Sequence, residues 1–352
     1  MDYPIHWRNY RLTGSNPGPD FAPGDWYKTP LTRQRLKALM RRSDRAGLIH
    51  YGLWLIAVAA TGTGLVLSWG TAWAFPAALC YGILYGSGSE SRWHECAHGT
   101  VFKTRWLNDL GYHLASFMTF KNPYLWRWSH TRHHTHTLVV GRDPEIAFPR
   151  PSRLISIILG MTSIKEAGKT LRLSIGKLTA DERDLLVEAE RTKTFWAARA
   201  HLAIHIGIIA LAVIQQSWLP VTLIGLPTLY GSWLHHLLAA TQHAGLAEDV
   251  PDHRFNSRTV IMNPVLRFVY TNMNYHLEHH MYPMVPFHAL PALHDAIKAD
   301  CPPAYPSTLA ALRELLPALW RQRRDPNHCV MRKLPNSANP TPHFTDTPAT
   351  PA

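Results

Sequence analysis

The stretch AGLIHYGLWLIAVAATGTGLVLSWGTAWAFPAALCYGILYGSGS, which covers residues 46–89, contains no Asp, Glu, Lys or Arg. A helix needs about 20 apolar residues to cross a bilayer, so this stretch is long enough for two helices. The sequence Trp69-Gly70-Thr71 interrupts it. We therefore predict a hairpin of two membrane-spanning helices, over Leu48–Ser68 and Ala72–Ser87.

A second charge-free stretch covers residues 200–247 and is interrupted by polar residues at 215–217 and by Pro220. It predicts helices over Ala200–Ile214 and Pro220–Ala240. The two hairpins together predict an all-α membrane protein with four spans. Leu107–Phe120 is apolar but short, and fits an interfacial or re-entrant helix better than a span. The alternative is a soluble protein that buries two long hairpins in its interior.

The distribution of charge predicts the orientation of these spans. Both hairpin tips lack charge and carry Trp69, Trp73 and Trp218, which suit a membrane interface, while every Lys and Arg lies on the other side. We expect a multi-pass integral membrane protein with both termini on the cytoplasmic face. The formal net charge of +12 indicates anionic partners. No nucleic-acid motif accompanies it, so the expected partner is the lipid bilayer and not nucleic acid.

The segments outside the hairpins are polar. Residues 1–45 form a polar N-terminal segment with a basic helix over Thr32–Arg45, which is either solvated or lies on anionic lipid. Residues 46–300 are the expected catalytic domain, in which 149–199 form cytoplasmic helices. Residues 301–334 are expected to form a C-terminal cytoplasmic helix. Residues 335–352 are rich in Pro, Thr, Ser and Asn, which predicts a disordered tail.

Three clusters account for much of the high histidine content, which is 22 residues. The first is an HxxxH pattern at 94–98, and the other two are HxxHH patterns at 130–134 and 276–280. All three lie on the predicted cytoplasmic side. A single HxxxH occurs by chance on many helices, but three such clusters next to membrane spans point to a shared site.

Helical spacing explains how these clusters could bind metal. Residues three and four apart share one face of a helix, whereas adjacent residues diverge by roughly 100°. The adjacent pair in each HxxHH can therefore serve two different ions. Neutral imidazole suits zinc, copper, iron and nickel, and eight histidines are too many for one zinc. We predict a histidine-rich dimetal site held by a cytoplasmic helical cap; ligand chemistry alone does not choose iron.

Three stretches carry a family resemblance: WHECAHGTVF at 93–102, WSHTRHHTHT at 128–137 and NYHLEHHMYPMVP at 274–286. In order, form and placement they resemble the histidine boxes of the membrane fatty acid desaturase/hydroxylase superfamily. The resemblance implies two iron ions and one further ligand after the fourth span, where His243 lies. His235 and His236 compete for that role but fall inside the predicted span. The implied ligands are His94, His98, His130, His133, His134, His243, His276, His279 and His280.

Other residues near the boxes are candidates for supporting roles. Ligating imidazoles usually donate their second N–H to an acceptor, which could be one of the carboxylates Glu95, Asp143, Glu145 and Glu278. Each of these could equally be a surface charge. His201 and His205 share a helix face and could support the site or carry protons, against the alternative of ordinary packing. Four other histidines, His6, His253, His328 and His343, are expected at the surface.

The resemblance also implies a reaction. A reduced di-iron centre activates O2 and removes hydrogen from an unactivated C–H bond, and we expect desaturation of a fatty acyl chain. The alternative is a hydroxylase or ketolase acting on an alkane, carotenoid, sphingolipid or small organic substrate. A separate electron donor is expected: a ferredoxin, rubredoxin or cytochrome with its reductase. A metal transporter or sensor is the remaining, non-enzymatic alternative.

Overall fold

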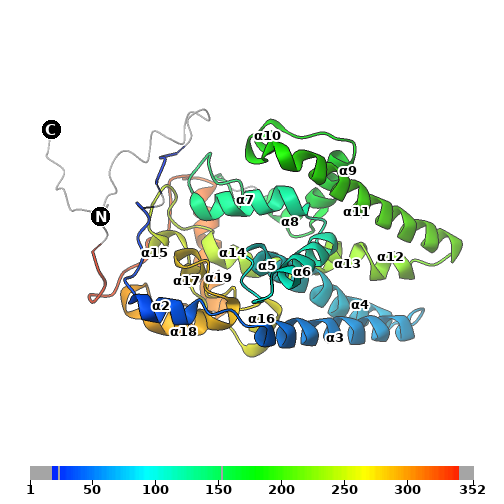
Figure 1. Cartoon of the computed structure of the whole chain (residues 1–352), viewed down its shortest axis with the longest axis horizontal. Helices are drawn as coiled ribbons and strands as arrows, with labels where there is room; N and C mark the ends of the chain where they lie inside the picture. Colours follow the sequence, from blue (N-terminus) through cyan, green and yellow to red (C-terminus); the bar gives the residue numbers. More distant parts are fainter. Residues whose placement is uncertain (1–17, 23, 152–153, 341–352) are drawn as a thin grey trace.

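The structure is a computed structural model that describes residues 18–22, 24–151 and 154–340. Every regular element in these ranges is a helix, and none is a β-strand (Figure 1). Isolated bridges, such as those of Thr259 with Tyr275 and Val260 with Tyr305, join a few extended residues. The all-α prediction is therefore confirmed for the described part of the chain.

The helices of the first half of the chain are α2 (Arg33–Leu39), α3 (Asp44–Ser68), α4 (Ala74–Gly82), the π-helix η1 (Ile83–Ser87), α5 (Gly88–Ala97), α6 (Arg105–Met118), α7 (Pro123–Thr135), α8 (Leu154–Gly160), α9 (Ile164–Ser174) and α10 (Ala180–Leu185). Those of the second half are α11 (Glu188–Ile214), α12 (Leu219–Leu223), α13 (Leu226–Gly231), α14 (Trp233–His243), α15 (His253–Asn256), α16 (Pro264–Val269), α17 (His276–Met281), the 3₁₀ helix η2 (Phe287–Ala289), α18 (Leu290–Ile297), η3 (Lys298–Asp300) and α19 (Thr308–Gln322).

The first predicted span forms α3, which begins at Asp44 rather than Leu48. The basic helix predicted over Thr32–Arg45 is split in two, and this part of the prediction is wrong. The Thr32 side chain caps α2, and the Ser43 side chain accepts a hydrogen bond from the Ala46 N–H at the start of α3. Each hydroxyl satisfies an N–H that the first turn of a helix leaves unpaired, so the chain restarts its helix at Asp44.

The second predicted span continues without a break into the first histidine box. α4, η1 and α5 follow one another directly from Ala74 to Ala97. The π-helix lies where α13 crosses at very short range: a Cβ at Gly231 would collide with the carbonyl of Gly82. Only glycine allows two backbones to approach so closely. This contact ties the box-bearing helix to the return segment of the second hairpin.

The second hairpin is less regular than predicted. Its first arm, α11, is a long helix that begins at Glu188, twelve residues before the predicted start at Ala200. Its second arm, predicted as one helix over Pro220–Ala240, is divided into α12, α13 and α14. Gly225 has a φ of 98°, and α13 begins at Leu226 with Pro227 in its first turn. A residue at positive φ leaves the helical backbone and a proline has no N–H to bond to the preceding turn, so the return arm is broken.

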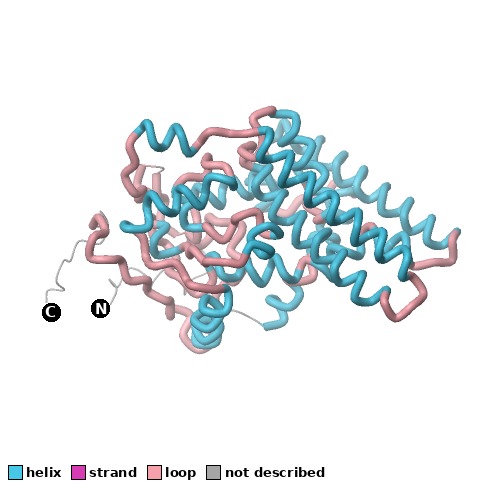
Figure 2. Tube along the Cα trace, turned by 90° about the horizontal axis from the view of Figure 1, so that it is seen from below, coloured by secondary structure: helices cyan, strands magenta, loops and turns pink. Residues whose placement is uncertain are grey.

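Two helical segments are long and apolar enough to cross a membrane: Arg33–Ser68, which joins α2 and α3, and Glu188–Ile214. Only 17% and 6% of their most apolar stretches are buried. Figures 1 and 2 show α3 and α11 extending to the same side of the molecule, away from α17 and α19. Helices that are apolar all round and exposed need a non-aqueous neighbour. The four-span topology goes further than this observation and remains a prediction.

The C-terminal part of the chain packs against the histidine-bearing helices. In α19, Leu315 and Leu319 contact Ala240 and Ala244 at the end of α14. The tail predicted from residue 335 is partly wrong, because Asn339 donates its backbone N–H to Asp300, 2.6 Å away. Residues 341–352, and residues 1–17 of the predicted N-terminal segment, lie outside the described residues.

Candidate metal centre

Nine histidine side chains converge in two groups. Within each group, one nitrogen of every imidazole lies within 4.8 Å of those of the others, which is close enough to hold one metal ion. They are the nine residues predicted from the sequence. The first group comprises His94, His98, His130, His134 and His279; the second comprises His133, His243, His276 and His280.

Helix geometry produces this division. In α7, His133 and His134 are adjacent and point to different groups, as do His279 and His280 in α17. The predicted divergence of adjacent histidines is therefore confirmed in both HxxHH boxes. His94 comes from α5, and His98 is the residue that ends that helix. His243 is the last residue of α14.

The nitrogens approach one another at distances that suit shared coordination. His98 Nε2 lies 2.9 Å from His130 Nε2, and His276 Nε2 lies 2.8 Å from His243 Nε2. Two imidazoles that bind one ion at about 2.0–2.1 Å bring their nitrogens to roughly this separation. Both nitrogens of His94 are buried without a hydrogen-bond partner among the described residues. The residues therefore fit a pair of metal ions.

Hydrogen bonds on the outer side fix the tautomers of three of the four histidines in the second group. His133 Nδ1 lies 2.8 Å from Asp143 Oδ2, and His243 Nδ1 lies 2.7 Å from the Asn256 carbonyl oxygen. Both oxygens can only accept, so each Nδ1 carries its hydrogen and each Nε2 keeps a free lone pair. Thr137 donates its hydroxyl to the His133 carbonyl and accepts from His280 Nδ1 at 3.0 Å. Three lone pairs thus point inward.

The first group has one such carboxylate, Glu145. Its Oε2 lies 3.0 Å from His130 Nδ1, and its Oε1 accepts from the Ser129 hydroxyl at 2.8 Å. Burial alone would raise the pKa of Glu145, but the neighbouring His130 and these hydrogen bonds lower it to about 2. The contacts of Asp143 with His133 and of Glu145 with His130 have the geometry expected of carboxylates that hold ligating imidazoles.

The other two candidate carboxylates behave differently. Glu278 contacts His294 Nδ1 at 2.5 Å and the Thr259 hydroxyl at 2.6 Å, not a histidine of the two groups. Glu95 Oε1 lies 3.6 Å from His94 Nδ1 and 3.9 Å from His279 Nδ1. Burial raises the pKa of Glu95 to about 8 in the metal-free protein, and bound cations would oppose this shift.

Burial also sets the protonation of the imidazoles. Together with repulsion between neighbours, it lowers the pKa of His94, His98, His134, His243, His276, His279 and His280 well below the usual value. Burial lowers the pKa of His133 as well, but the attraction and hydrogen bond of Asp143 outweigh it and raise the pKa. Neutral imidazole is the metal-binding form, so most of the cluster is ready to coordinate at neutral pH.

Four histidines that the sequence offered for other roles, His201, His205, His235 and His236, lie outside the two groups. His201 and His205 pack against Phe117, at ring-centroid distances of 5.4 and 4.9 Å, and these contacts favour ordinary packing over a supporting role. His235 lies 3.3 Å from the Ser91 hydroxyl. His236 lies 3.3 Å from the Ser163 hydroxyl. Neither belongs to a metal-binding group, so the structure favours His243 over both.

The prediction for His253 is wrong. It is buried, it stacks on Trp26 at 4.5 Å, and its ring centroid lies 5.2 Å from that of His280. Sequence reasoning missed it because Pro251, Asp252 and His253 form a polar stretch without periodicity. Its stacking partner comes from the distant N-terminal segment, which no local pattern identifies. His6 and His343 lie outside the described residues.

Two cavities reach the histidines. One of about 550 Å³ is lined by His94 and His130 of the first group and by His133, His243 and His276 of the second. A smaller one of about 290 Å³ is lined by His98, His134 and His280. Both cavities meet both groups, and the larger one is the better candidate for the reacting part of a substrate because it has more room.

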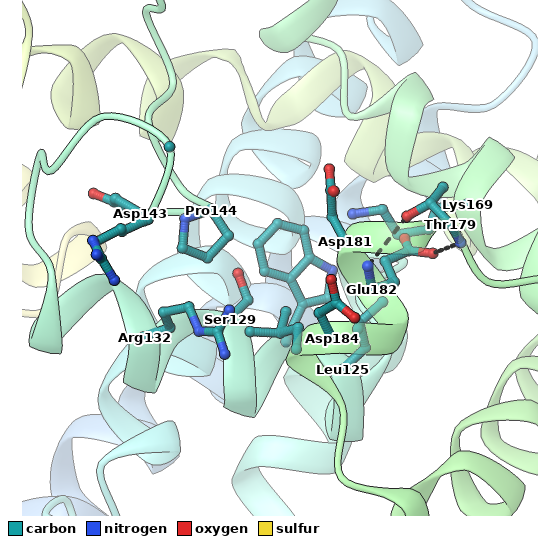
Figure 3. A pocket seen from close by; sticks show the side chains of 14 residues that line it. Leu125, Ser129, Arg132, Asp143, Pro144, Lys169, Thr179, Asp181, Glu182 and Asp184 are labelled. Carbon is teal, nitrogen blue, oxygen red and sulfur yellow. Dashed lines mark hydrogen bonds between the residues drawn. The ribbon is translucent and has the colours of Figure 1, made fainter. Parts of the chain in front are cut away.

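A third cavity, of about 470 Å³, lies outside the supporting carboxylates. Ser129, Arg132 and Asp143 lie on one side of it, and Asp181, Glu182 and Asp184 of α10 lie on the other (Figure 3). No histidine of either group lines it. This cavity is therefore separate from the candidate metal site, although Asp143, which contacts His133, also lines it.

The sequence profile of the fatty acid desaturases matches residues 68–310, a range that contains all three boxes and His243. This chain belongs to the fatty acid desaturase family. A "Delta(9) fatty acid conjugase-like enzyme" from Dimorphotheca sinuata is 24% identical over 273 residues, which cover 66% of this chain and 69% of that protein. The resemblance carried by the boxes is confirmed. As a member of this family, the chain is a desaturase-type oxidoreductase.

Proposed function

We propose that this desaturase-family protein oxidises unactivated C–H bonds with O2 at two iron ions, and that its main product is a fatty acyl chain with a new double bond. One observation carries the proposal: two groups of convergent imidazoles, each buried or half-buried, lie side by side in a member of this family. Their nitrogen donors suit iron. The ions would be held by the five histidines of the first group and the four of the second.

The chain's own residues prepare the site. When bound, the metal pair supplies the activation of O2 and the removal of hydrogen. Asp143 and Glu145 orient His133 and His130, so that each Nε2 points inward. The Glu95 carboxyl lies within 4 Å of His94 and His279. The larger cavity admits the substrate to both groups.

We also propose a membrane arrangement and a division of the chain. The catalytic domain covers residues 46–300 and spans the bilayer four times, with the metal site and both termini on the cytoplasmic face. It is preceded by the polar N-terminal segment and followed by the C-terminal cytoplasmic helix. The exposed apolar surfaces of α3 and α11 support insertion in lipid. The electron donor is a separate ferredoxin, rubredoxin or cytochrome.

The test is a reconstituted assay. The protein in lipid nanodiscs is loaded with iron, its metal content is measured, and reduced ferredoxin with its reductase and acyl substrates of several headgroups are supplied under 18O2. An alkene without label, formed with O2 consumption by a protein that holds two irons, supports desaturation. A labelled alcohol would favour the hydroxylase alternative, and an iron-loaded, reduced protein that oxidises no substrate would count against the proposal.

A further inference from the structure

The larger cavity is not the purely apolar tunnel that a hydrocarbon chain would favour. A buried ion pair between Glu90 and Lys121 lies in its wall. The Lys121 ammonium also lies 4.0 Å from the ring centroid of Trp93 and 5.1 Å from that of Trp126. Ion pairing and cation–π contacts together fix this charged group beside the cavity.

Two polar atoms in the wall have no hydrogen-bond partner among the described residues. They are Glu90 Oε1 and Gln242 Nε2. Their residues are only 1% and 8% exposed. A buried polar atom without a partner costs about 1–3 kcal/mol. One of these atoms accepts a hydrogen bond and the other donates one, so the cavity offers a complementary pair of unused positions.

Both positions lie close to the metal-binding groups. Glu90 precedes His94 by four residues on α5, so their side chains share one helix face about 5–6 Å apart at Cβ. Gln242 directly precedes His243 at the end of α14. A group bound to these two side chains would therefore lie only a few carbon atoms from the reacting centre.

We infer that this cavity binds a substrate with a neutral group that both donates and accepts, an amide or a hydroxyl, whose hydrogen meets Glu90 and whose oxygen meets Gln242. The oxidised C–H bond then lies a few carbons from that group. A carboxylate has no hydrogen to donate to the Glu90 oxygen, and a thioester offers no donor either. The inference rests on the proposed function, since it treats the cavity as the place of reaction.

The test compares two probes of equal chain length. Dodecanamide offers N–H and C=O, whereas N,N-dimethyldodecanamide offers only C=O. Binding to the iron-loaded protein in nanodiscs is measured by calorimetry without reductant, so no turnover is needed. We expect dodecanamide to bind about tenfold more tightly, which corresponds to one net hydrogen bond. Equal affinities would overturn the inference, because the N–H of the amide would then contribute nothing to binding.

A variant provides the second arm of the test. Gln242→Leu is expected to weaken dodecanamide binding by about tenfold, while Gln215→Leu, at the exposed end of α11, leaves it unchanged. Iron content is measured for each variant; if Gln242→Leu loses iron, the comparison of the two amides in the unaltered protein still decides. Preferential amide binding without any oxidation in the complete assay would overturn the proposed function but not the binding inference.

Discussion

Asp143→Asn is the sharpest test of the second metal-binding group. The Asp143 side chain accepts three hydrogen bonds, each of 2.8 Å: from His133 Nδ1 and the Leu138 N–H on Oδ2, and from the Glu145 N–H on Oδ1. All three partners are donors. Whichever way an asparagine amide turns, its NH2 group must face at least one of them. The substitution keeps the shape of the side chain but leaves at least one of the three donors without an acceptor.

The magnitude follows from these contacts. One buried donor left without an acceptor costs about 1–3 kcal/mol. Loss of the carboxylate behind a ligating imidazole typically weakens metal binding by about 10–100-fold, which is about 1.4–2.7 kcal/mol. Because Asp143 contacts His133 directly but reaches His130 of the first group only through Glu145, the larger loss should fall on the second group.

The assay is metal content after dialysis against a graded series of chelator concentrations. We expect the unaltered protein to release both ions at similar chelator concentrations, and Asp143→Asn to release one of them at a chelator concentration lower by about 10–100-fold. Asp184→Asn, an exposed carboxylate in the cavity of Figure 3, is the matched control. Release of both ions by Asp143→Asn at the unaltered midpoint would refute the assigned role of Asp143.

Three further predictions test the fold and its charges. Acidifying the metal-free protein from pH 7.5 to 5.5 should lower its apparent Tm. Unfolded histidines bind protons near pH 6.5, whereas the seven histidines with lowered pKa values stay neutral in the folded protein, so acid favours the unfolded state. An unchanged Tm would contradict their burial. Gly231→Ala should destabilise strongly in thermal unfolding, since its Cβ would collide with the Gly82 backbone, whereas Gly64→Ala, whose Cβ meets nothing, should be tolerated; similar Tm values for both would exclude the close crossing. Arg254→Leu should cost about 3–5 kcal/mol, seen as a lower Tm, because it leaves the buried Asp252 and Asp300 carboxylates without their shared cation; a Tm equal to that of the exposed Arg183→Leu control would show that the pairing contributes little.

Periodic patterns in the sequence predicted the parts of the site that lie on helices. The spacing of each box determined which histidines share a face, and the two groups follow that spacing. Glu278 could have been excluded by the same rule, because two residues from His276 places it on the opposite side of α17. Glu145 could not have been chosen over it, since its contact with His130 depends on how the chain turns after α7.

Other features depended on tertiary contacts. The apolar composition of residues 220–240 predicted one helix, although Gly225 and Pro227 provided a signal for the break that composition obscured. His253 is buried by Trp26, which lies more than two hundred residues away in the sequence. Asn339 packs against Asp300 although its surroundings have the composition of a disordered tail. Composition describes a segment by itself, whereas these residues are placed by their partners.

The π-helix at Ile83–Ser87 sets the angular phase of the first box. Its i→i+5 bonds take up one more residue per turn than the i→i+4 bonds on either side. Each residue of an α-helix turns the side chains by roughly 100°. Were this turn an ordinary α-helical one, His94 and His98 would rotate away from His130 and His279 while the helix itself kept its path. The π turn thus acts as a rotational offset between the glycine contact at Gly82 and the metal-binding face, and an insertion or deletion in this stretch should turn both box histidines away from their group.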